Sequence, residues 1–506
     1  MQVNLLHPAD HEPRPAGNGD NTFDDLGLES LCTAASDDPV IRDAVRAGLT
    51  APVSDPEVIG YRHAVLADCQ AHPTVVGELY RIASQATEVR RRKAGPLHRA
   101  SGKLLLALEP LTELVTFLRQ LRTLCDRDGH RFRAPGLTDL MAVIVAELDD
   151  RYLDSVEAQL AAMDFDRGLH ISAGLGTGNR IAGIVLHEPI RRRRFGFDRP
   201  SRHAFRVIDE PDPEFDPVMQ LRDRAVSVIA DVVNDAVVHV QDFFRRLRTE
   251  LAFYVGCLAL HDRFRNAGLP VCLPTPHPAG RARLRCTGLR DVTLCLTSGR
   301  PVVGNDIDAA GRSLIVITGA NSGGKSTLLR SIGSAQLMMQ AGMYVVADTF
   351  EADVHDGVFT HFVTDEDRTL SHGKLADELA RMSRIVDRIT PNSLLLCNES
   401  FSSTGEHDAT HIGAPLVDAL LETGISIAFV THLYEFAHRR YQSAHPTDLF
   451  LRAGHHPDGT RTFSFTSAPP EPTSHADDVF RRIFDAPTVF HGSDGSALPG
   501  RGGRAR

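Results

Sequence analysis

Glycine, lysine and serine recur at a spacing suited to phosphate binding between residues 319 and 326. The segment reads Gly319-Ala320-Asn321-Ser322-Gly323-Gly324-Lys325-Ser326. It follows an apolar, strand-like run at 314–317 and opens a helix-like run at 327–332. In that context the glycines let the backbone curl so that its N–H groups face phosphate oxygens, and the helix N-terminus adds partial positive charge. A glycine-rich turn that binds nothing is the alternative.

This pattern predicts a phosphate-binding loop (P-loop) for ATP. Lys325 is expected to reach the β- and γ-phosphates, and the hydroxyl of Ser326 to coordinate Mg²⁺. The residues expected to contact ATP in and beside the loop are Gly319, Asn321, Gly323, Gly324, Lys325, Ser326 and Thr327.

A second apolar run ends in polar residues that suit the same chemistry. Leu394–Cys397 is followed by Asn398 and Glu399. In P-loop enzymes an aspartate there holds magnesium, and a following glutamate polarises the attacking water. Asn398 carries no charge, so we expect weaker Mg²⁺ binding and slower turnover. Glu399 is the candidate catalytic base; the alternative is a core strand that ends in a surface glutamate.

A third strand-like run, 427–430, ends in Thr431 and His432. A histidine at this place can contact the γ-phosphate and sense its hydrolysis. Taken alone, one histidine among 24 is more often structural. Its position after the loop and after Glu399 makes His432 the second candidate catalytic residue.

The elements around these motifs change character along the chain. Residues 23–269 have mostly helical periodicity, with amphipathic runs at about 102–126, 137–163 and 217–266. Glycine-rich turn signals between β-branched residues predict a small hairpin over 170–188. From residue 314 onward, short apolar runs alternate with helical segments, which predicts a largely parallel sheet covered by helices.

Composition narrows the function classes. The 506 residues carry a formal net charge of −10, which argues against a protein coated in nucleic acid but leaves room for local basic surfaces. Two such runs are 90–93 and Arg191-Arg192-Arg193-Arg194; each is either a solvated surface or a phosphate contact. No apolar run is long enough to span a membrane. The eight cysteines are scattered singly, as expected in a reducing cytoplasm.

The changes in composition and periodicity along the chain suggest four segments. Residues 1–22, rich in Pro, Gly, Asp and Asn, are expected to form a mobile leader. Residues 23–275 form a helical domain and 276–490 an ATPase domain. Residues 491–506 are of low complexity and are expected to be disordered.

The order of the motifs resembles the ABC-type ATPase domain of the MutS family of DNA-repair proteins. The likeness is closest over 317–333, and Asn321 matches the asparagine of the family's loop. Segments 303–307 and 341–347 also resemble family segments, the latter with Val346 in place of proline. Segment 398–404 takes the place of the family's Asp-Glu segment, and Thr431-His432 matches its switch histidine. The likeness is specific over 303–435 and weaker over the rest of 23–485.

The resemblance implies an α/β P-loop ATPase domain of the ABC/MutS type, preceded by a mostly α-helical lever domain. It also implies a signature loop, at 369–378, that closes on ATP held by a second subunit. Ser371 or Gly373 at a helix N-terminus would then contact a γ-phosphate, although an ordinary helix cap explains them equally well. The family's mismatch-recognition domain is not expected, since no phenylalanine has a glutamate two positions later.

Three hypotheses follow. The first is a homodimeric, cytoplasmic, DNA-binding ATPase in which ATP and Mg²⁺ move the lever, acting in mismatch repair, other DNA repair or recombination; Arg191–Arg194 would touch DNA. The second is a nucleotide-dependent switch or scaffold with little hydrolysis that acts through protein partners. The third is an ATPase of the SMC or RecN kind. The absence of long heptad repeats, which would form coiled-coil arms, counts against it.

Overall fold

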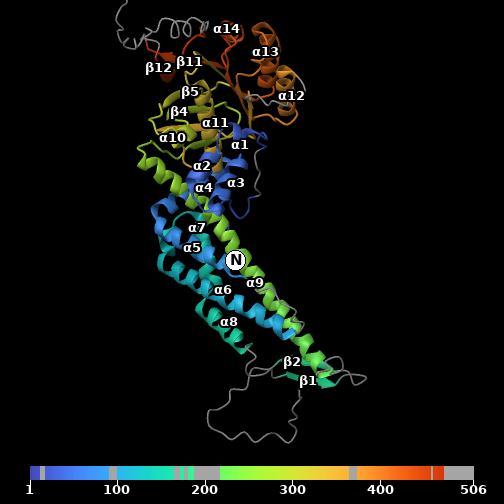
Figure 1. Ribbon diagram of the computed structural model, residues 1–506. Helices are drawn as coiled ribbons and strands as arrows, with labels where there is room; N and C mark the ends of the chain where they lie inside the picture. The colour runs from blue at the N-terminus through green and yellow to red at the C-terminus, as the bar shows by residue number, and fades with distance from the viewer. Residues whose placement is uncertain are drawn as a thin grey trace, which may run out of the picture.

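The molecule is elongated, with two β-sheets at one end and a helical arm reaching toward the other (Figure 1). The computed structural model describes residues 1–11, 17–90, 100–163, 171–175, 181–186, 217–363, 373–456 and 460–471. A two-stranded hairpin lies at the far tip of the arm, and helices α12, α13 and α14 lie at the opposite end. The predicted DNA-contacting run Arg191–Arg194, the predicted ATP contact Ser371 and the tail at 491–506 lie outside the described residues.

Helices account for most of the arm and cover the sheets. In chain order they are α1 (Thr22–Asp25), α2 (Glu29–Ala35), α3 (Pro39–Thr50), α4 (Pro56–Ala71), α5 (Pro73–Glu88), α6 (Ala100–Asp128), the 3₁₀ turn η1 (Gly129–Arg131), α7 (Pro135–Glu147), α8 (Asp150–Ala162), α9 (Pro217–Asn266), α10 (Val292–Thr297), α11 (Lys325–Ala341), α12 (Lys374–Val386), α13 (Glu406–Glu422) and α14 (Tyr434–Gln442).

Strands make up the hairpin and the two sheets. They are β1 (Ile171–Leu175), β2 (Ile181–Leu186), β3 (Thr275–His277), β4 (Leu284–Leu289), β5 (Asn305–Asp308), β6 (Leu314–Thr318), β7 (Thr349–Asp353), β8 (Val358–Phe362), β9 (Leu394–Asn398), β10 (Ser426–Val430), β11 (Asp448–His455) and β12 (Arg461–Ser467). Strands β1 and β2 pair antiparallel, which confirms the predicted hairpin.

The spine of the arm is α9, a single helix of 50 residues that matches the predicted run at 217–266. Its buried side chains recur every three or four residues, as in Val226, Ala230, Val233 and Val237. That periodicity forms one apolar stripe, against which α3, α5 and α6 pack. The predicted run at 137–163 is instead two helices, because the carboxylate of Asp149 caps α8 and starts a new helix.

Six strands form the larger sheet, in the order β12-β11-β6-β10-β9-β8. All neighbours pair parallel except β11 and β12, so the predicted, largely parallel sheet is confirmed. Strand β6 is buried throughout, as expected for a strand covered on both faces. Ile317, Val430 and Asn398 are register neighbours near the carboxyl ends of β6, β10 and β9. The segments that follow these three strands therefore start side by side.

The smaller sheet, in the order β3-β7-β4-β5, mixes parallel and antiparallel pairs. It lies beside the larger sheet, and β5 contacts β12. Asn305 of β5 joins the two sheets: its amide donates a hydrogen bond to the carbonyl of Phe463 and accepts one from the backbone N–H of Phe465.

The described residues of the expected leader, 1–11 and 17–22, are packed against the body. Leu5 is fully buried, and its backbone is hydrogen-bonded to Glu250 and Tyr254 of α9. Further along, the hydroxyl of Thr22 donates to the carbonyl of Val358, an edge residue of the larger sheet. The N-terminal segment thus covers part of this edge instead of projecting from the molecule. The division at residues 275 and 490 stays a prediction.

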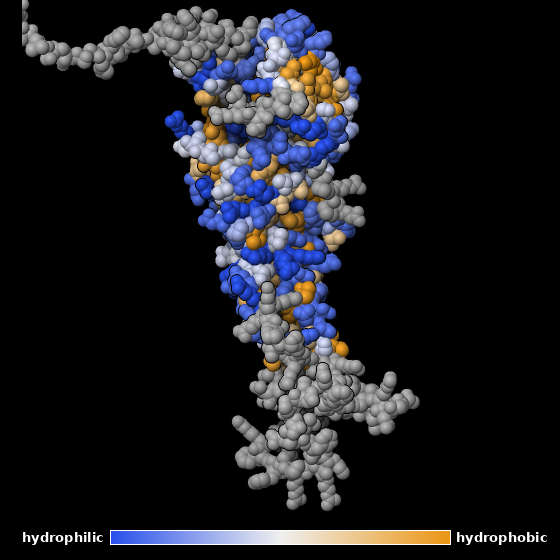
Figure 2. All heavy atoms as spheres, turned by 45° about the vertical axis from the view of Figure 1, so that its right-hand side comes forward, coloured by the Kyte–Doolittle hydropathy of each residue, from blue (hydrophilic) through white to orange (hydrophobic). Residues whose placement is uncertain are grey.

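The face seen in Figure 2 is mostly hydrophilic, and its most extensive apolar patch lies at the end of the molecule that carries α12–α14. Among the described helices, none is long and apolar enough to cross a membrane.

Candidate functional site

The glycine-rich loop joins β6 to α11 and depends on backbone conformations that favour glycine. Gly319 has φ 122° and Gly324 has φ 91°. A Cβ at Gly319 would lie 2.8 Å from the Cβ of Ala453 on β11, so the close approach of the loop to that strand also requires glycine. Ser322, at the tip, has φ 57° without being glycine. The loop is therefore held in a strained, specific shape, as is common at ligand-binding sites.

Lys325 lies under this loop and is only 4% exposed. Its Nζ donates hydrogen bonds to the carbonyls of Gly319 and Ala320, over 2.9 and 3.2 Å. Within the described part of the chain, no carboxylate forms an ion pair with it. Burial accordingly lowers the pKa of Lys325 to about 8. A buried ammonium with only carbonyl partners is well placed to receive an anion.

The N-terminus of α11 opens beside Lys325. Among the described residues, no side chain caps this helix end, and Gly324 occupies the N-cap position. The first N–H groups of a helix have no partner inside the helix, and they carry a partial positive charge. Together with the ammonium of Lys325, they form a site that attracts a phosphate group.

Ser326 and Asn398 approach each other from α11 and β9. The hydroxyl of Ser326 donates to the side-chain oxygen of Asn398 over 2.9 Å. Two neutral oxygens side by side suit Mg²⁺, which prefers oxygen ligands and keeps several of its waters. The donor set therefore fits the metal, with one negative charge fewer than an aspartate would supply.

Glu399 follows β9 in a left-handed conformation, with φ 59°. Its backbone N–H donates to the carbonyl of Val430, and its Oε1 accepts a hydrogen bond from Nε2 of His432 over 2.8 Å. This hydrogen bond is the main cause that holds the pKa of Glu399 below its usual value. At neutral pH the carboxylate is therefore ionised and able to accept a proton.

These groups open into one cavity of about 460 Å³. The predicted residues that line it are Asn321, Gly323, Gly324, Lys325, Ser326, Thr327 and Glu399. Gly319, Asn398 and His432 do not line the cavity but hydrogen-bond to residues that do. Gly373, at the N-cap of α12, is not among its lining residues. A single chain thus brings the loop, Glu399 and His432 together. Gly373, the described residue of the two predicted in the signature loop, does not line the cavity of the same chain.

Comparison with known proteins assigns both parts of the chain. Residues 54–267 match the family described as "MutS2 N-terminal domain", and residues 315–467 match "MutS domain V". The chain belongs to the MutS family.

Full-length relatives of this MutS-family chain are similar over part of their length. "DNA mismatch repair protein MutS" of Chloroflexus aurantiacus is 31% identical over 144 residues, which are 28% of this chain and 15% of that protein. "DNA mismatch repair protein MSH3" of Mycosarcoma maydis is 28% identical over 207 residues, 39% of this chain and 18% of that protein. "MutS protein homolog 4" of Mus musculus is 29% identical over 143 residues, 28% of this chain and 15% of that protein. The match therefore spans less than a fifth of each relative.

Part of the cavity in this MutS-family chain comes from residues that the sequence did not point to. Phe463 of β12 lines it, as do residues 300–302, whereas Val303 and Asn305, which also line it, belong to the segment 303–307 that resembles the family. Phe463 is 47% exposed and has φ 56°, which is unusual for an aromatic residue in a strand. Its ring lies at the rim, beside the loop, where it can cover a flat group. The alternating pattern of β12 carries no signal of this role.

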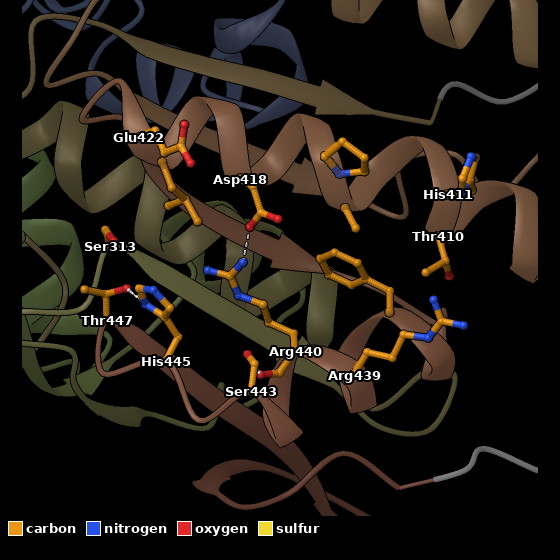
Figure 3. A pocket seen from close by; sticks show the side chains of 14 residues that line it. Ser313, Thr410, His411, Asp418, Glu422, Arg439, Arg440, Ser443, His445 and Thr447 are labelled. Carbon is orange, nitrogen blue, oxygen red and sulfur yellow. Dashed lines mark hydrogen bonds and ion pairs between the residues drawn. The ribbon is translucent and has the colours of Figure 1, made fainter.

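A second cavity, of about 720 Å³, lies between α13 and α14 (Figure 3). Ser313 and Thr447, which immediately precede β6 and β11, line it, so it lies at the end of the sheet opposite the loop. Figure 3 shows Arg440 pointing to Asp418, and its guanidinium also pairs with the carboxylate of Asp448. None of the predicted site residues lines this cavity, and its most buried cation already has partners.

Proposed function

We propose that this chain is a DNA-binding ATPase of the MutS family. One observation carries the proposal: the buried ammonium of Lys325, the uncapped start of α11 and the ionised Glu399 converge on one cavity. That combination offers cations to a polyphosphate and a base to water, the two requirements for hydrolysing ATP.

In the proposed reaction, the loop N–H groups and Lys325 bind the β- and γ-phosphates of ATP. Ser326 and Asn398 hold Mg²⁺, which when bound neutralises phosphate charge. Glu399 accepts a proton from the water that attacks the γ-phosphorus, and the bond from that phosphorus to the bridging oxygen breaks to leave ADP and inorganic phosphate. His432 keeps Glu399 ionised and directed by its hydrogen bond.

We propose that two copies complete the site. Support comes from Gly373, which lies outside the residues that line the cavity of one chain. A second copy would bring the N-terminus of its α12 to the γ-phosphate, and a two-fold dimer is the commonest arrangement that does this for both sites. Binding of ATP would then change how the two arms are held relative to each other.

DNA is the proposed partner of the arm. Two of the relatives named above carry the name DNA mismatch repair protein, and each is similar to this chain over part of its length. A role in DNA repair, with ATP moving the α9 lever, follows as a proposal. Cytoplasmic location is part of the same proposal.

The deciding experiment measures Mg²⁺-dependent ATP hydrolysis with and without duplex, branched and mismatched DNA, together with DNA binding at rising salt. We expect turnover that DNA changes, and affinity that falls steeply with salt because phosphates are contacted. Absence of salt-sensitive binding to every DNA tested, with and without ATP, would refute the DNA role.

A second function is favoured by Asn398. An amide in place of a carboxylate leaves the metal position with less charge, and its side chain is already hydrogen-bonded to Ser326. The chain would then bind ATP tightly, hydrolyse it very slowly and act as a switch on protein partners. Rapid turnover by the wild type would exclude this alternative.

A further inference from the structure

Glu399 reaches the cavity from a strained turn. Both Glu399 and Phe401 have left-handed φ values, of 59° and 67°, and neither is glycine. Such conformations persist only where surrounding contacts over-determine them. Ser400 lies between the two residues and is 1% exposed, while the ring of Phe401 is fully buried. The contacts of these two buried side chains therefore decide where Glu399 points.

His361 of β8 supplies those contacts. Its Nδ1 lies 2.6 Å from the hydroxyl oxygen of Ser400, and its ring stacks on Phe401 with the ring centres 5.9 Å apart. The imidazole is 1% exposed. His361 precedes Ser400 of the turn by 39 residues. The pairing of β8 with β9 places it beside the turn, because His361 is the register partner of Cys397 near the end of β9.

The proton positions on His361 follow from its partners. Nε2 lies 3.1 Å from the backbone carbonyl of Glu378, which can only accept, so Nε2 carries a proton. Burial lowers the pKa of His361 to about 4, and the ring is therefore neutral. Nδ1 then accepts the hydroxyl proton of Ser400, because this contact of 2.6 Å is shorter than the 3.3 Å from the same hydroxyl to its other acceptor, the backbone carbonyl of His361. The imidazole links the turn to α12 through two directed hydrogen bonds.

A second bond joins the same two elements. The hydroxyl of Ser403 donates to Oε2 of Glu378 over 2.8 Å, and Glu378 is 4% exposed. Helix α12 is thus fastened to the turn on either side of Phe401, through Ser400 and through Ser403. None of these groups lines the cavity.

We propose that His361 is a positioning residue for hydrolysis: by accepting the hydroxyl proton of Ser400, it holds the strained turn that directs the Glu399 carboxylate into the cavity. The proposal rests on the proposed ATPase function. In this arrangement the orientation of the Glu399 carboxylate depends on α12, whose N-cap is Gly373 and whose Glu378 is hydrogen-bonded to His361 and Ser403. Ground-state binding of ATP does not depend on this alignment, whereas the attack of water does.

The test compares kcat with the affinity for a non-hydrolysable ATP analogue in the full chain. In Ser400→Ala the hydroxyl is lost. We expect kcat to fall at least about tenfold, because small misplacements of a catalytic group are costly, while the analogue's Kd stays within about twofold. Ser383→Ala removes an exposed hydroxyl on α12 and serves as the matched control.

His361→Phe keeps a ring on Phe401 but removes both hydrogen bonds, and His361→Asn restores an acceptor near Nδ1. We expect the Phe variant to match Ser400→Ala, the double variant to be no slower than the slower single one, and the Asn variant to recover part of the rate. If His361→Phe does not fold, Ser400→Ala still decides.

The failures are distinguishable. Wild-type turnover that Glu399→Gln abolishes but Ser400→Ala leaves at the control rate overturns the positioning role alone. A wild type without turnover overturns the proposed ATPase function and the positioning role with it. Turnover that is indifferent to Glu399→Gln removes Glu399 from the mechanism and overturns the positioning role, while ATP hydrolysis itself stands.

Discussion

Nε2 of His432 lies 2.8 Å from Oε1 of Glu399, and the two residues follow β10 and β9, which are neighbours in the sheet. The contact arises because both strands end at the same level. It gives the candidate base a donor that keeps it ionised before any nucleotide is present.

Lys325→Met should abolish tight ATP binding without weakening the fold. A hydrogen bond to a charged group contributes about 1.5–3 kcal/mol, so affinity should fall by roughly ten- to a hundredfold or more. Removing a buried ammonium that lacks an ion-pair partner should leave the thermal midpoint unchanged or higher. Isothermal titration and thermal unfolding check both parts. Lys103→Met, at an exposed position of α6, should bind ATP like the wild type.

ATP binding near pH 8 should be accompanied by proton uptake. The pKa of Lys325 is lowered to about 8 in the free protein, and a bound phosphate favours the ammonium and raises it. Affinity should therefore decline as the pH rises above 8. Titrations in buffers of different ionisation enthalpy measure the uptake, which should vanish in Lys325→Met. Equal uptake in that variant would assign the proton to another group.

The same pKa shift affects stability. Between pH 8 and 10.5, the usual pKa of lysine, the folded protein binds fewer protons at Lys325 than the unfolded chain does. The contribution of this residue to the free energy of unfolding should therefore increase with pH across that window. Denaturant titrations of wild type and Lys325→Met at several pH values isolate it as a difference.

Glu399→Gln should bind ATP and fail to hydrolyse it. General-base catalysis contributes about 10²–10⁴-fold, so kcat should fall at least about a hundredfold with little change in affinity. Single-turnover assays with labelled ATP measure the rate. Glu422→Gln, at the exposed C-terminal end of α13, is the matched control. A variant that still turns over at the wild-type rate would remove Glu399 from the mechanism.

His432→Phe should move the acidic limb of the rate profile to higher pH. The hydrogen bond from His432 is the main cause of the lowered pKa of Glu399, so its loss raises that pKa and leaves less of the carboxylate ionised at mildly acidic pH. His432→Gln retains a donor and should shift the limb less. The kcat profiles of both variants are compared with that of His407→Phe, which alters an exposed histidine on α13.

Asn398→Asp should tighten Mg²⁺ binding. A carboxylate beside Ser326 adds a charge to the metal position, and we expect the half-saturating Mg²⁺ concentration to fall about tenfold, equivalent to ~1.4 kcal/mol. The measurement is ATP turnover against free Mg²⁺. Faster turnover would accompany this change if the metal limits the wild type. An unchanged Mg²⁺ dependence would place the metal elsewhere.

Local sequence was sufficient to predict the loop, since its glycines, Lys325 and Ser326 lie within one continuous segment between a strand and a helix. It also predicted α9 and the parallel sheet, because apolar periodicity is a local property. The contact between His361 and Ser400 is different in kind. It depends on which strands become neighbours, and no spacing along the chain records that.

Two other features escaped prediction for related reasons. The polar composition of residues 1–22 suggests a leader, yet Leu5 and Thr22 are held by partners more than 200 positions away. Phe463 acquires its place at the cavity rim from a positive φ that its residue type disfavours. In each case tertiary contacts overrode a local preference.

The bond from Thr22 to Val358 joins positions 336 residues apart. At roughly 5–20 residues per second, residues 17–25 leave the ribosome about 20–70 s before β8 does. An uncovered edge strand is a template for pairing with another chain. Here residues 17–25, which cover the edge at β8, have already been synthesised when β8 leaves the ribosome. The order of synthesis therefore shortens the time during which the uncovered strand of a newly made chain can pair with another chain.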